Sequence, residues 1–135
     1  MQYWLLKSEP NTWSWDQQVK EGPSMWDGVR NYQARNNLKK MKKGDSCFFY
    51  HSVTEKSIVG IVKVVKEFYP DPTDETGKFV VVDVKATKKL KNVVLLNDIK
   101  KNKKFQKIAL IKQSRLSVMP LKKLEWNLII KMSSL

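Results

Sequence analysis

Two runs rich in β-branched residues, with a proline-rich stretch between them, constrain the fold of this chain more than any other feature. The first run is "SIVGIVKVVKEFY" (residues 57–69) and the second is "KFVVVDVKAT" (residues 78–87). Valine and isoleucine favour strands because their branched side chains pack well on a pleated surface, and "YPDPTDETG" between the runs is typical of a turn. We therefore expect two strands here, with Gly60 marking a bulge or a close approach of another segment.

Three further segments have the composition of strands. They are "YWLLK" (residues 3–7), "SCFFYHS" (residues 46–52) and "RLSVMP", which we expect Pro120 to end. The segments between strands are too short for repeated β-α-β units, so we expect an α+β fold with a mainly antiparallel sheet that curves or closes into a barrel. A chain of 135 residues is the size of one domain, and no linker or repeat divides it, so we expect a single domain over residues 1–135.

Helices are indicated by capping residues and by apolar spacing. Ser14 and Gln17 form a capping-box pattern, and Gly22-Pro23 would end that helix. A second helix is expected before Gly44. We also expect a short helix capped by Asn97 and an amphipathic helix in "LKKLEWNLIIKM". The apolar face expected for this last helix consists of Leu121, Leu124, Leu128 and Met132.

The net charge of +13 is unevenly distributed along the chain. Residues 1–62 carry +3 and residues 63–135 carry +10, and residues 85–112 contain ten Lys opposed only by Asp98. Such a field attracts polyanions, so nucleic acid is the expected class of partner and an anionic membrane surface the second. For any single lysine, a solvated position without a partner is nearly as well supported.

The apolar runs of the sequence are short. "MQYWLLKSEP" has four consecutive apolar residues before a charged one, too few for a signal peptide, and no run approaches the roughly 20 apolar residues of a membrane span. We therefore expect a cytoplasmic protein without a membrane partner, associated with the nucleoid if bacterial and nuclear if eukaryotic. No obligate protein partner can be deduced.

Few residues could support catalysis. His51 is the only histidine and Cys47 the only thiol. On a strand they would lie about 13 Å apart at roughly 3.3 Å per residue, too far to pair. No phosphate-binding glycine loop or metal-ligand spacing is present, and we expect the cysteine to be buried and inert. The sequence thus favours a protein that is not an enzyme and needs no cofactor or metal.

Arginine is scarce in this basic chain. Only Arg30, Arg35 and Arg115 are arginines among 26 basic residues. A guanidinium donates hydrogen bonds in a fixed planar fork and stacks on aromatic rings, which an ammonium does not. We therefore expect these positions to recognise a base edge, a phosphate or a structural carboxylate such as Asp27 or Glu9.

Tryptophan is concentrated near the N-terminus. Four of the five Trp fall within the first 26 residues. We expect Trp4 and Trp126 in the core because they lie in apolar segments. Trp26 precedes Asp27-Gly28 outside any apolar run, so it is the better candidate for a surface or a pocket. Aromatic faces exposed there could stack on nucleobases.

The order of several motifs resembles the EVE domain family, which is PUA-like. The motifs are "YWLLKSEP", "WSWDQ", "MWDGVRNYQARNNLKKMKKGD", "FFYHS", "GIVKVVKEFYPDPT" and "RLSVMP" followed by "LEW", and together they span essentially the whole chain. The resemblance implies a PUA-like curved antiparallel β-barrel with short peripheral helices. It also implies a pocket that receives a modified base, 5-methylcytosine or an oxidised derivative, flipped out of DNA.

Carried onto matching positions, the resemblance implies a base-binding pocket formed by five segments. The residues concerned are Ser8, Glu9, Trp26, Val29, Arg30, Asn31, Tyr32, Tyr50, His51, Ser52, Tyr69, Arg115, Leu116, Ser117 and Val118.

Recognition of a flipped base requires aromatic stacking and polar contacts to its edge. We expect Trp26 with Tyr32 or Tyr69 to sandwich the ring, and a neutral, hydrogen-bonded His51 beside the pocket. The side chains expected at the base edge are Asn31, Ser52 and Ser117. Lysines within residues 85–112 would hold the phosphate backbone. DNA with a modified cytosine is thus the expected partner, RNA the alternative, and an enzyme acting on modified nucleotides the least favoured reading.

Overall fold

A computed structural model describes residues 1–134. Within them, six strands form one sheet: β1 (Tyr3–Ser8), β2 (Ser24–Met25), β3 (Ser46–His51), β4 (Ser57–Pro70), β5 (Val80–Leu95) and β6 (Val118–Leu121). The helices are α1 (Trp15–Glu21), α2 (Tyr32–Lys40), α3 (Leu96–Lys101), the 3-10 helix η1 (Lys103–Phe105), α4 (Ala109–Lys112) and α5 (Lys123–Ser133).

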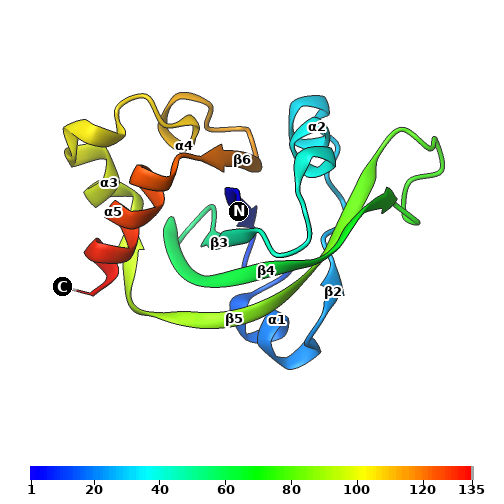
Figure 1. The fold of residues 1–135 in the computed structure, drawn as a ribbon, viewed down its shortest axis with the longest axis horizontal. Helices are drawn as coiled ribbons and strands as arrows, with labels where there is room; N and C mark the ends of the chain where they lie inside the picture. Colours follow the sequence, from blue (N-terminus) through cyan, green and yellow to red (C-terminus); the bar gives the residue numbers. More distant parts are fainter. Residues whose placement is uncertain (135) are drawn as a thin grey trace.

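The strands follow the order β2-β5-β4-β3-β1-β6 across the sheet. The two valine-rich runs of the sequence become β4 and β5, which pair along their length as one long, curved ribbon (Figure 1). α3, α4 and α5 lie together on the left in Figure 1 and α2 on the right, with β6 between them. The predicted α+β class with a curved, mainly antiparallel sheet is confirmed.

The predicted barrel is not closed. β2 and β6 are the two edges of the sheet, and each has only one neighbouring strand within the described residues. α2 contacts both β5 and the edge strand β6. The Asn37 side chain of α2 donates to the carbonyl of Val118 on the β6 edge at 2.7 Å. An edge strand is covered here by a helix, one of the ways in which proteins protect unpaired edges.

One strand pair is parallel, which the sequence did not predict. β1 runs parallel to β3, with Leu5 opposite Phe48. The chain between them contains α1, β2 and α2, so it is long enough to return to the starting edge before β3 begins. The remaining strand pairs are antiparallel.

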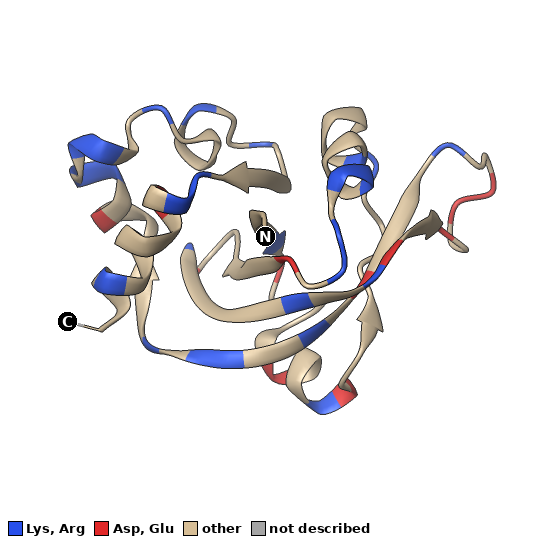
Figure 2. Cartoon of the chain, in the orientation of Figure 1, with Lys and Arg blue, Asp and Glu red and all other residues tan. Residues whose placement is uncertain are grey.

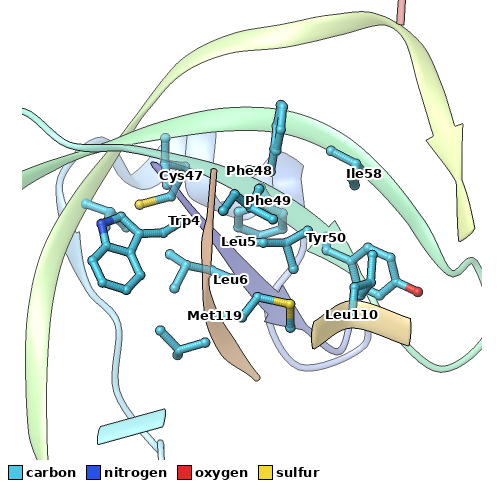
Figure 3. Close-up of a cluster of buried hydrophobic side chains, with 14 of the residues drawn as sticks. Trp4, Leu5, Leu6, Cys47, Phe48, Phe49, Tyr50, Ile58, Leu110 and Met119 are labelled. Carbon is cyan, nitrogen blue, oxygen red and sulfur yellow. The ribbon is translucent and has the colours of Figure 1, made fainter. Parts of the chain in front are cut away.

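A cluster of buried side chains lies on the adjacent strands β1 and β3 (Figure 3). Phe48 stacks on Trp126 of α5 with ring centroids 3.8 Å apart, and Trp4 donates from its indole nitrogen to Asp45 at 3.0 Å. Trp4 and Trp126 are therefore core residues, as predicted. Cys47 is fully buried, which raises the pKa of its thiol, as does the nearby carboxylate of Asp45.

α1 begins as its capping residues predict. The hydroxyl of Ser14 accepts from the backbone of Gln17, and the side chain of Gln17 accepts from the backbone of Ser14 at 2.8 Å. Trp15, the first residue of α1, packs directly over Gly60 of β4. A methyl group at position 60 would lie 2.5 Å from ring atoms of that tryptophan, so Gly60 marks a close approach as well as a register shift in the sheet.

Three helix boundaries differ from expectation. α2 ends at Lys40, and Gly44 instead occupies the turn before β3 with a positive φ of 96°. β5 continues to Leu95, so α3 begins before Asn97 and has no side-chain cap. Leu121 belongs to β6 rather than to α5. Of the other residues expected on the apolar face of α5, Leu128 and Met132 are partly buried and pack against the core, whereas Leu124 is 65% exposed.

Pro120 lies inside β6 rather than ending it. β6 is an edge strand, so a residue without an N–H group can be accommodated there without losing a bond of the ladder.

Candidate nucleic-acid interface

A pocket of about 830 Å³ opens beside the end of β1. It is formed by the end of β1, the segment leading into α1, the last residue of α1, β2 and the following loop, with one residue from the segment before β6. Its volume is in the range of ordinary ligand pockets. The residues that line it are Lys7, Ser8, Glu9, Thr12, Trp13, Glu21, Pro23, Ser24, Met25, Trp26, Asp27, Gly28, Val29, Arg30, Asn31 and Ser117.

Hydrogen bonds fix the end of β1 at the pocket. The backbone N–H of Lys7 donates to the carbonyl of Ser117 at 2.9 Å, and the hydroxyl of Ser8 donates to the carbonyl of Trp13. The backbone N–H of Ser52 donates to the carbonyl of Ser8 at 2.9 Å. β1 is therefore held by segments on both sides where its side chains enter the pocket.

Two tryptophans supply aromatic surface to the pocket. Trp26 is only 7% exposed and meets Phe49 edge-on at 5.5 Å between ring centroids. Trp26 is thus both packed in the core and part of the pocket lining. Sequence reasoning had treated a core position and a pocket position as alternatives. Trp13 is half-buried and donates from its indole nitrogen to Gln18 at 3.0 Å. Trp13 was not among the predicted site residues, although its place in "WSWDQ" offered a signal.

The lining of the pocket is mixed in charge, unlike the strongly basic chain. It contains the carboxylates of Glu9, Glu21 and Asp27 and the basic side chains of Lys7 and Arg30. Lys7 is half-buried, and its ammonium donates to the carbonyl of Ser114 at 2.8 Å. Burial lowers the pKa of Lys7. This lysine was also missed by sequence reasoning, because nothing in "YWLLK" distinguishes it from a strand residue facing solvent.

The loop after β2, residues 26–31, forms one wall of the pocket and is called the Gly28 loop below. Gly28 has a positive φ of 78°, which L-amino acids with side chains rarely adopt. Asn31 ends the loop as the N-cap of α2, because its side chain accepts from the backbone of Ala34 at 2.9 Å. Arg30 forms an ion pair with Asp71 at 3.0 Å. A base edge, a phosphate or a structural carboxylate such as Asp27 or Glu9 was expected for this arginine, and the carboxylate that it contacts is Asp71.

The predicted site residues divide into those that line this pocket and those that do not. Seven line it: Ser8, Glu9, Trp26, Val29, Arg30, Asn31 and Ser117. Tyr32 and Tyr69 do not. Tyr32 is 54% exposed and stacks on Phe79 at 5.3 Å. The hydroxyl of Tyr69 donates to Asp83, and burial together with that contact raises the pKa of Tyr69 to about 12.

Tyr50, His51 and Ser52 lie next to the pocket-lining end of β1 without lining the pocket. The Nε2 atom of His51 accepts from the backbone of Trp15 at 3.0 Å, so its Nδ1 atom carries the proton and donates to Glu55 at 3.0 Å. Tyr50 is 3% exposed, and burial raises its pKa to about 12. His51 thus holds the start of α1, and none of these three residues lines the pocket.

The segment before β6 contributes one lining residue. Arg115 is exposed, Leu116 and Val118 are buried, and Ser117 between them faces the pocket. Arg115 does not line the pocket, so its guanidinium could contact a ligand only outside the pocket.

All ten lysines within residues 85–112 are exposed. They lie along two stretches, one on β5 and one from the end of α3 to α4. Figure 2 shows basic residues on both stretches, and acidic residues on the loop between β4 and β5. The lysines are thus spread over two parts of the surface.

Within residues 1–134, no cluster of three or more His, Cys, Asp or Glu side chains could hold a metal ion. No helix in that range combines the length and the apolar character needed to cross a membrane.

Comparisons with known proteins identify relatives of the whole chain. The EVE domain family model matches residues 2–132. Thymocyte nuclear protein 1 of Gallus gallus is 36% identical over 96% of this chain and 68% of its own length.

Two solved structures share the fold closely. A protein from Rhodopseudomonas palustris is 50% identical with a TM-score of 0.93, covering 99% of this chain and 94% of its own. The human THYN1 protein, solved in complex with DNA containing 5-methylcytosine, is 32% identical with a TM-score of 0.88, covering 100% and 99%. These likenesses agree with the PUA-like fold implied by the sequence motifs, except that the sheet is open.

Proposed function

The chain belongs to the EVE domain family, and from this membership we propose that it is a non-enzymatic nucleic-acid-binding module that reads a modified base. The proposed ligand is 5-methylcytosine or an oxidised derivative, flipped out of DNA into the pocket beside β1. The observation that carries the proposal is the likeness, over nearly the full length of both chains, to the human THYN1 protein bound to DNA containing 5-methylcytosine.

The pocket supplies the groups that a flipped base requires. A base that leaves a duplex loses its stacking and pairing, at a cost of a few kcal/mol. Trp13 and Trp26 offer aromatic surface to replace the stacking, and Asn31 and Ser117 offer polar groups to replace the pairing. From the sequence we expected Trp26 with Tyr32 or Tyr69 to sandwich the ring, and we now propose Trp13 as the second ring because it lines the pocket.

The 5-methyl group adds only apolar contact. Burial of a group of this size contributes about 0.8 kcal/mol, which corresponds to roughly fourfold in affinity. Selectivity for 5-methylcytosine over cytosine should therefore be modest, whereas a hydroxymethyl group would gain more if Ser117 or Asn31 bonds it.

The lysines within residues 85–112 are proposed to attract the phosphate backbone without regard to sequence. Their exposure supports this part of the proposal, because an exposed ammonium can approach a phosphate from the solvent.

Binding without catalysis is supported by the state of His51. Both ring nitrogens are engaged, one by the backbone of Trp15 and the other by Glu55, and the ring does not line the pocket. Modified nucleotides incubated with the protein should yield no product by mass spectrometry. Turnover that is lost in His51→Ala would instead make the chain an enzyme.

A binding panel tests the proposal directly. Short DNA duplexes that differ at one position, carrying cytosine, 5-methylcytosine or 5-hydroxymethylcytosine, are titrated by fluorescence anisotropy, each also as a single strand and as matched RNA. We expect the modified DNA to bind about fourfold or more tightly than the unmodified DNA. Equal affinities across the panel would refute base reading, and a preference for RNA would replace DNA as the partner.

The cellular location stays a prediction. The curated relative from Gallus gallus is nuclear by its name, and we propose a location where nucleic acid is accessible.

A further inference from the structure

Asp71, at the start of the loop between β4 and β5, holds a buried carboxylate. The residue is 2% exposed, and each of its two side-chain oxygens accepts two hydrogen bonds. Oδ1 accepts from the backbone and the hydroxyl of Thr73, at 2.7 and 2.6 Å. Oδ2 accepts from the backbone of Gly28 at 3.1 Å and from the guanidinium of Arg30 at 3.0 Å. One carboxylate therefore ties its own loop to the Gly28 loop.

The two residues bound by Oδ2 line the pocket, and Asp71 itself does not. Gly28 and Arg30 belong to a stretch without helix or strand, between β2 and α2. The ends of that stretch are held by other bonds, since the backbone of Trp26 donates to Val82 at 2.8 Å and Asn31 caps α2. Asp71 thus fixes the middle of the Gly28 loop from behind the pocket wall.

Arg30 is oriented by several contacts that act with Asp71. Its guanidinium also donates to the hydroxyl of Thr73 and to the carbonyl of Val29, at 3.0 and 3.1 Å, and lies 5.3 Å from the ring centroid of Phe79. A planar fork is needed to make these contacts together, and a lysine ammonium has no such geometry. The side chain of Arg30 nevertheless remains 41% exposed. The contacts hold its direction and leave part of it open to a ligand.

The carboxylate of Asp71 is held in its charged form. Burial by itself would raise the pKa, but the hydrogen bonds donated by Thr73, Arg30 and Gly28 outweigh burial and lower the pKa below its usual value. The group therefore remains ionised at any pH near neutrality.

We propose that Asp71 is a positioning residue for base reading, which sets the Gly28 amide and the Arg30 guanidinium at the pocket wall. This inference rests on the proposed function, because it assigns Asp71 a role in the same pocket. Asp71 acts through these two residues and makes no contact with the base.

The same loop contains a natural control. Asp74 accepts hydrogen bonds from the backbone and hydroxyl of Thr76 and from the backbones of Lys78 and Phe79, but none from the Gly28 loop. Asp71 with Thr73 and Asp74 with Thr76 are therefore two carboxylate and hydroxyl pairs with the same spacing in the chain, of which Asp71 is buried and Asp74 only partly buried. Only the first pair reaches the pocket wall.

The test compares Asp71→Asn and Thr73→Val with Asp74→Asn and Thr76→Val in the full chain, by titration of duplexes with and without 5-methylcytosine. We expect Asp71→Asn to weaken binding of the modified duplex about tenfold and Thr73→Val about threefold, because the variants lose a charged acceptor or a neutral hydroxyl that orients Arg30. The two control variants should bind as the wild type does. The milder Thr73→Val keeps the comparison informative if Asp71→Asn fails to fold.

A purely structural role of Asp71 is separated by a double-mutant cycle. If Asp71 acts through Arg30, then adding Arg30→Gln to Asp71→Asn should weaken binding by less than Arg30→Gln does in the wild type. In the double variant of Arg30→Gln with Asp74→Asn, the two changes in binding free energy should be additive. The slope of affinity against salt should not change in Asp71→Asn, since every phosphate-binding lysine is still present.

Two results would overturn the inference in a wild type that prefers the modified duplex. One is an equal loss of affinity in all four single variants, and the other is no loss of affinity in Asp71→Asn and Thr73→Val. A wild type without any preference would overturn the proposed function, and the inference with it.

Discussion

The pocket and the lysine-rich segment, residues 85–112, are both proposed to bind nucleic acid, yet they are built in opposite ways. In the pocket, Trp26 is packed at 7% exposure and Arg30 is held by Asp71 and Thr73. In the lysine-rich segment all ten ammonium groups are on exposed residues. Packed and hydrogen-bonded groups can distinguish one ligand shape from another, whereas exposed charges attract any polyanion. From this difference we propose that selection of the base and attraction of the phosphate backbone reside in separate parts of the chain.

The two regions also differ in charge. The pocket lining has three carboxylates and two basic side chains, while the lysine-rich segment has ten Lys and one Asp. Binding that depends on the pocket should therefore respond to the shape of the base, and binding that depends on the lysines should respond to salt. Each prediction below perturbs one region and asks whether the other is affected.

The largest effect is expected for Trp26→Ala. Truncation of a buried aromatic side chain costs about 3–5 kcal/mol of unfolding free energy, and here it also removes a ring from the pocket. We expect the preference for 5-methylcytosine to disappear, while the salt dependence of binding remains. Urea denaturation and anisotropy titrations at several salt concentrations measure the two consequences separately.

Trp126→Ala is the matched control for that variant. Trp126 is also 7% exposed and also packs on a phenylalanine, Phe48, but it lies on α5 and does not line the pocket. It should cost a similar unfolding free energy and keep the base preference of the folded protein. If both variants lose the preference equally, Trp26 acts through stability alone.

The second effect is expected for Gly60→Ala. The added methyl group would lie 2.5 Å from the ring of Trp15, so α1 must move away from β4. Overpacking of this kind costs about 1–3 kcal/mol. Because α1 ends at the pocket with Glu21, we also expect weaker base selection. Thermal unfolding checks the stability, with Lys63→Ala on the exposed face of the same strand as a control that should change little. Unchanged stability in Gly60→Ala would contradict the close approach.

Local patterns were predicted from the sequence better than relations between distant segments. The Ser14 capping box depends on residues three apart, and the strand character of β4 and β5 depends on composition, so both were read correctly. The parallel pairing of β1 with β3 and the open edge beside β6 depend on how the chain returns across the sheet. No local signal encodes that path.

The candidate site shows the same limit at the level of side chains. The segments around Ser8, Trp26 and Ser117 do meet at one pocket, because the family motifs carry information on their assembly. Sequence reasoning had no means to find that Tyr69 is engaged by Asp83 or that the partner of Arg30 is Asp71. Those pairings join positions far apart in the chain, and only the fold brings them together.

The third prediction concerns the lysine-rich segment. Replacing Lys100, Lys101, Lys103 and Lys104 by Gln should weaken binding of modified and unmodified DNA alike, by roughly tenfold if each exposed charge contributes about 0.3–0.5 kcal/mol. The slope of log affinity against log salt should fall by up to about 0.9 for each phosphate that the variant no longer neutralises. The ratio of the two affinities should stay constant, since the pocket is intact.

A matched set tests whether position matters or only total charge. Lys39, Lys40, Lys42 and Lys43 are also exposed and lie at the end of α2 and in the turn after it. Their replacement by Gln removes the same charge from another surface. We expect a smaller change in the salt slope, and an equal change would mean that the field of the whole protein, rather than the lysine-rich segment, attracts the nucleic acid.

The smallest effect is expected for Arg35→Lys, which separates shape from charge at a single position. The guanidinium of Arg35 lies 4.8 Å from the ring centroid of Tyr32 and donates to the carbonyl of Lys78 at 3.2 Å. Lysine keeps the charge but loses the planar stack, which contributes about 0.5–1 kcal/mol at an exposed site. Urea denaturation should show this loss with the salt slope of DNA binding unchanged.

Arg115→Lys, on an exposed residue, should alter the unfolding free energy by less than about 0.5 kcal/mol. If Arg35→Lys is equally neutral, then the planar geometry of the guanidinium does not stabilise the fold at position 35, and Arg30 is left as the arginine whose contacts require a planar fork.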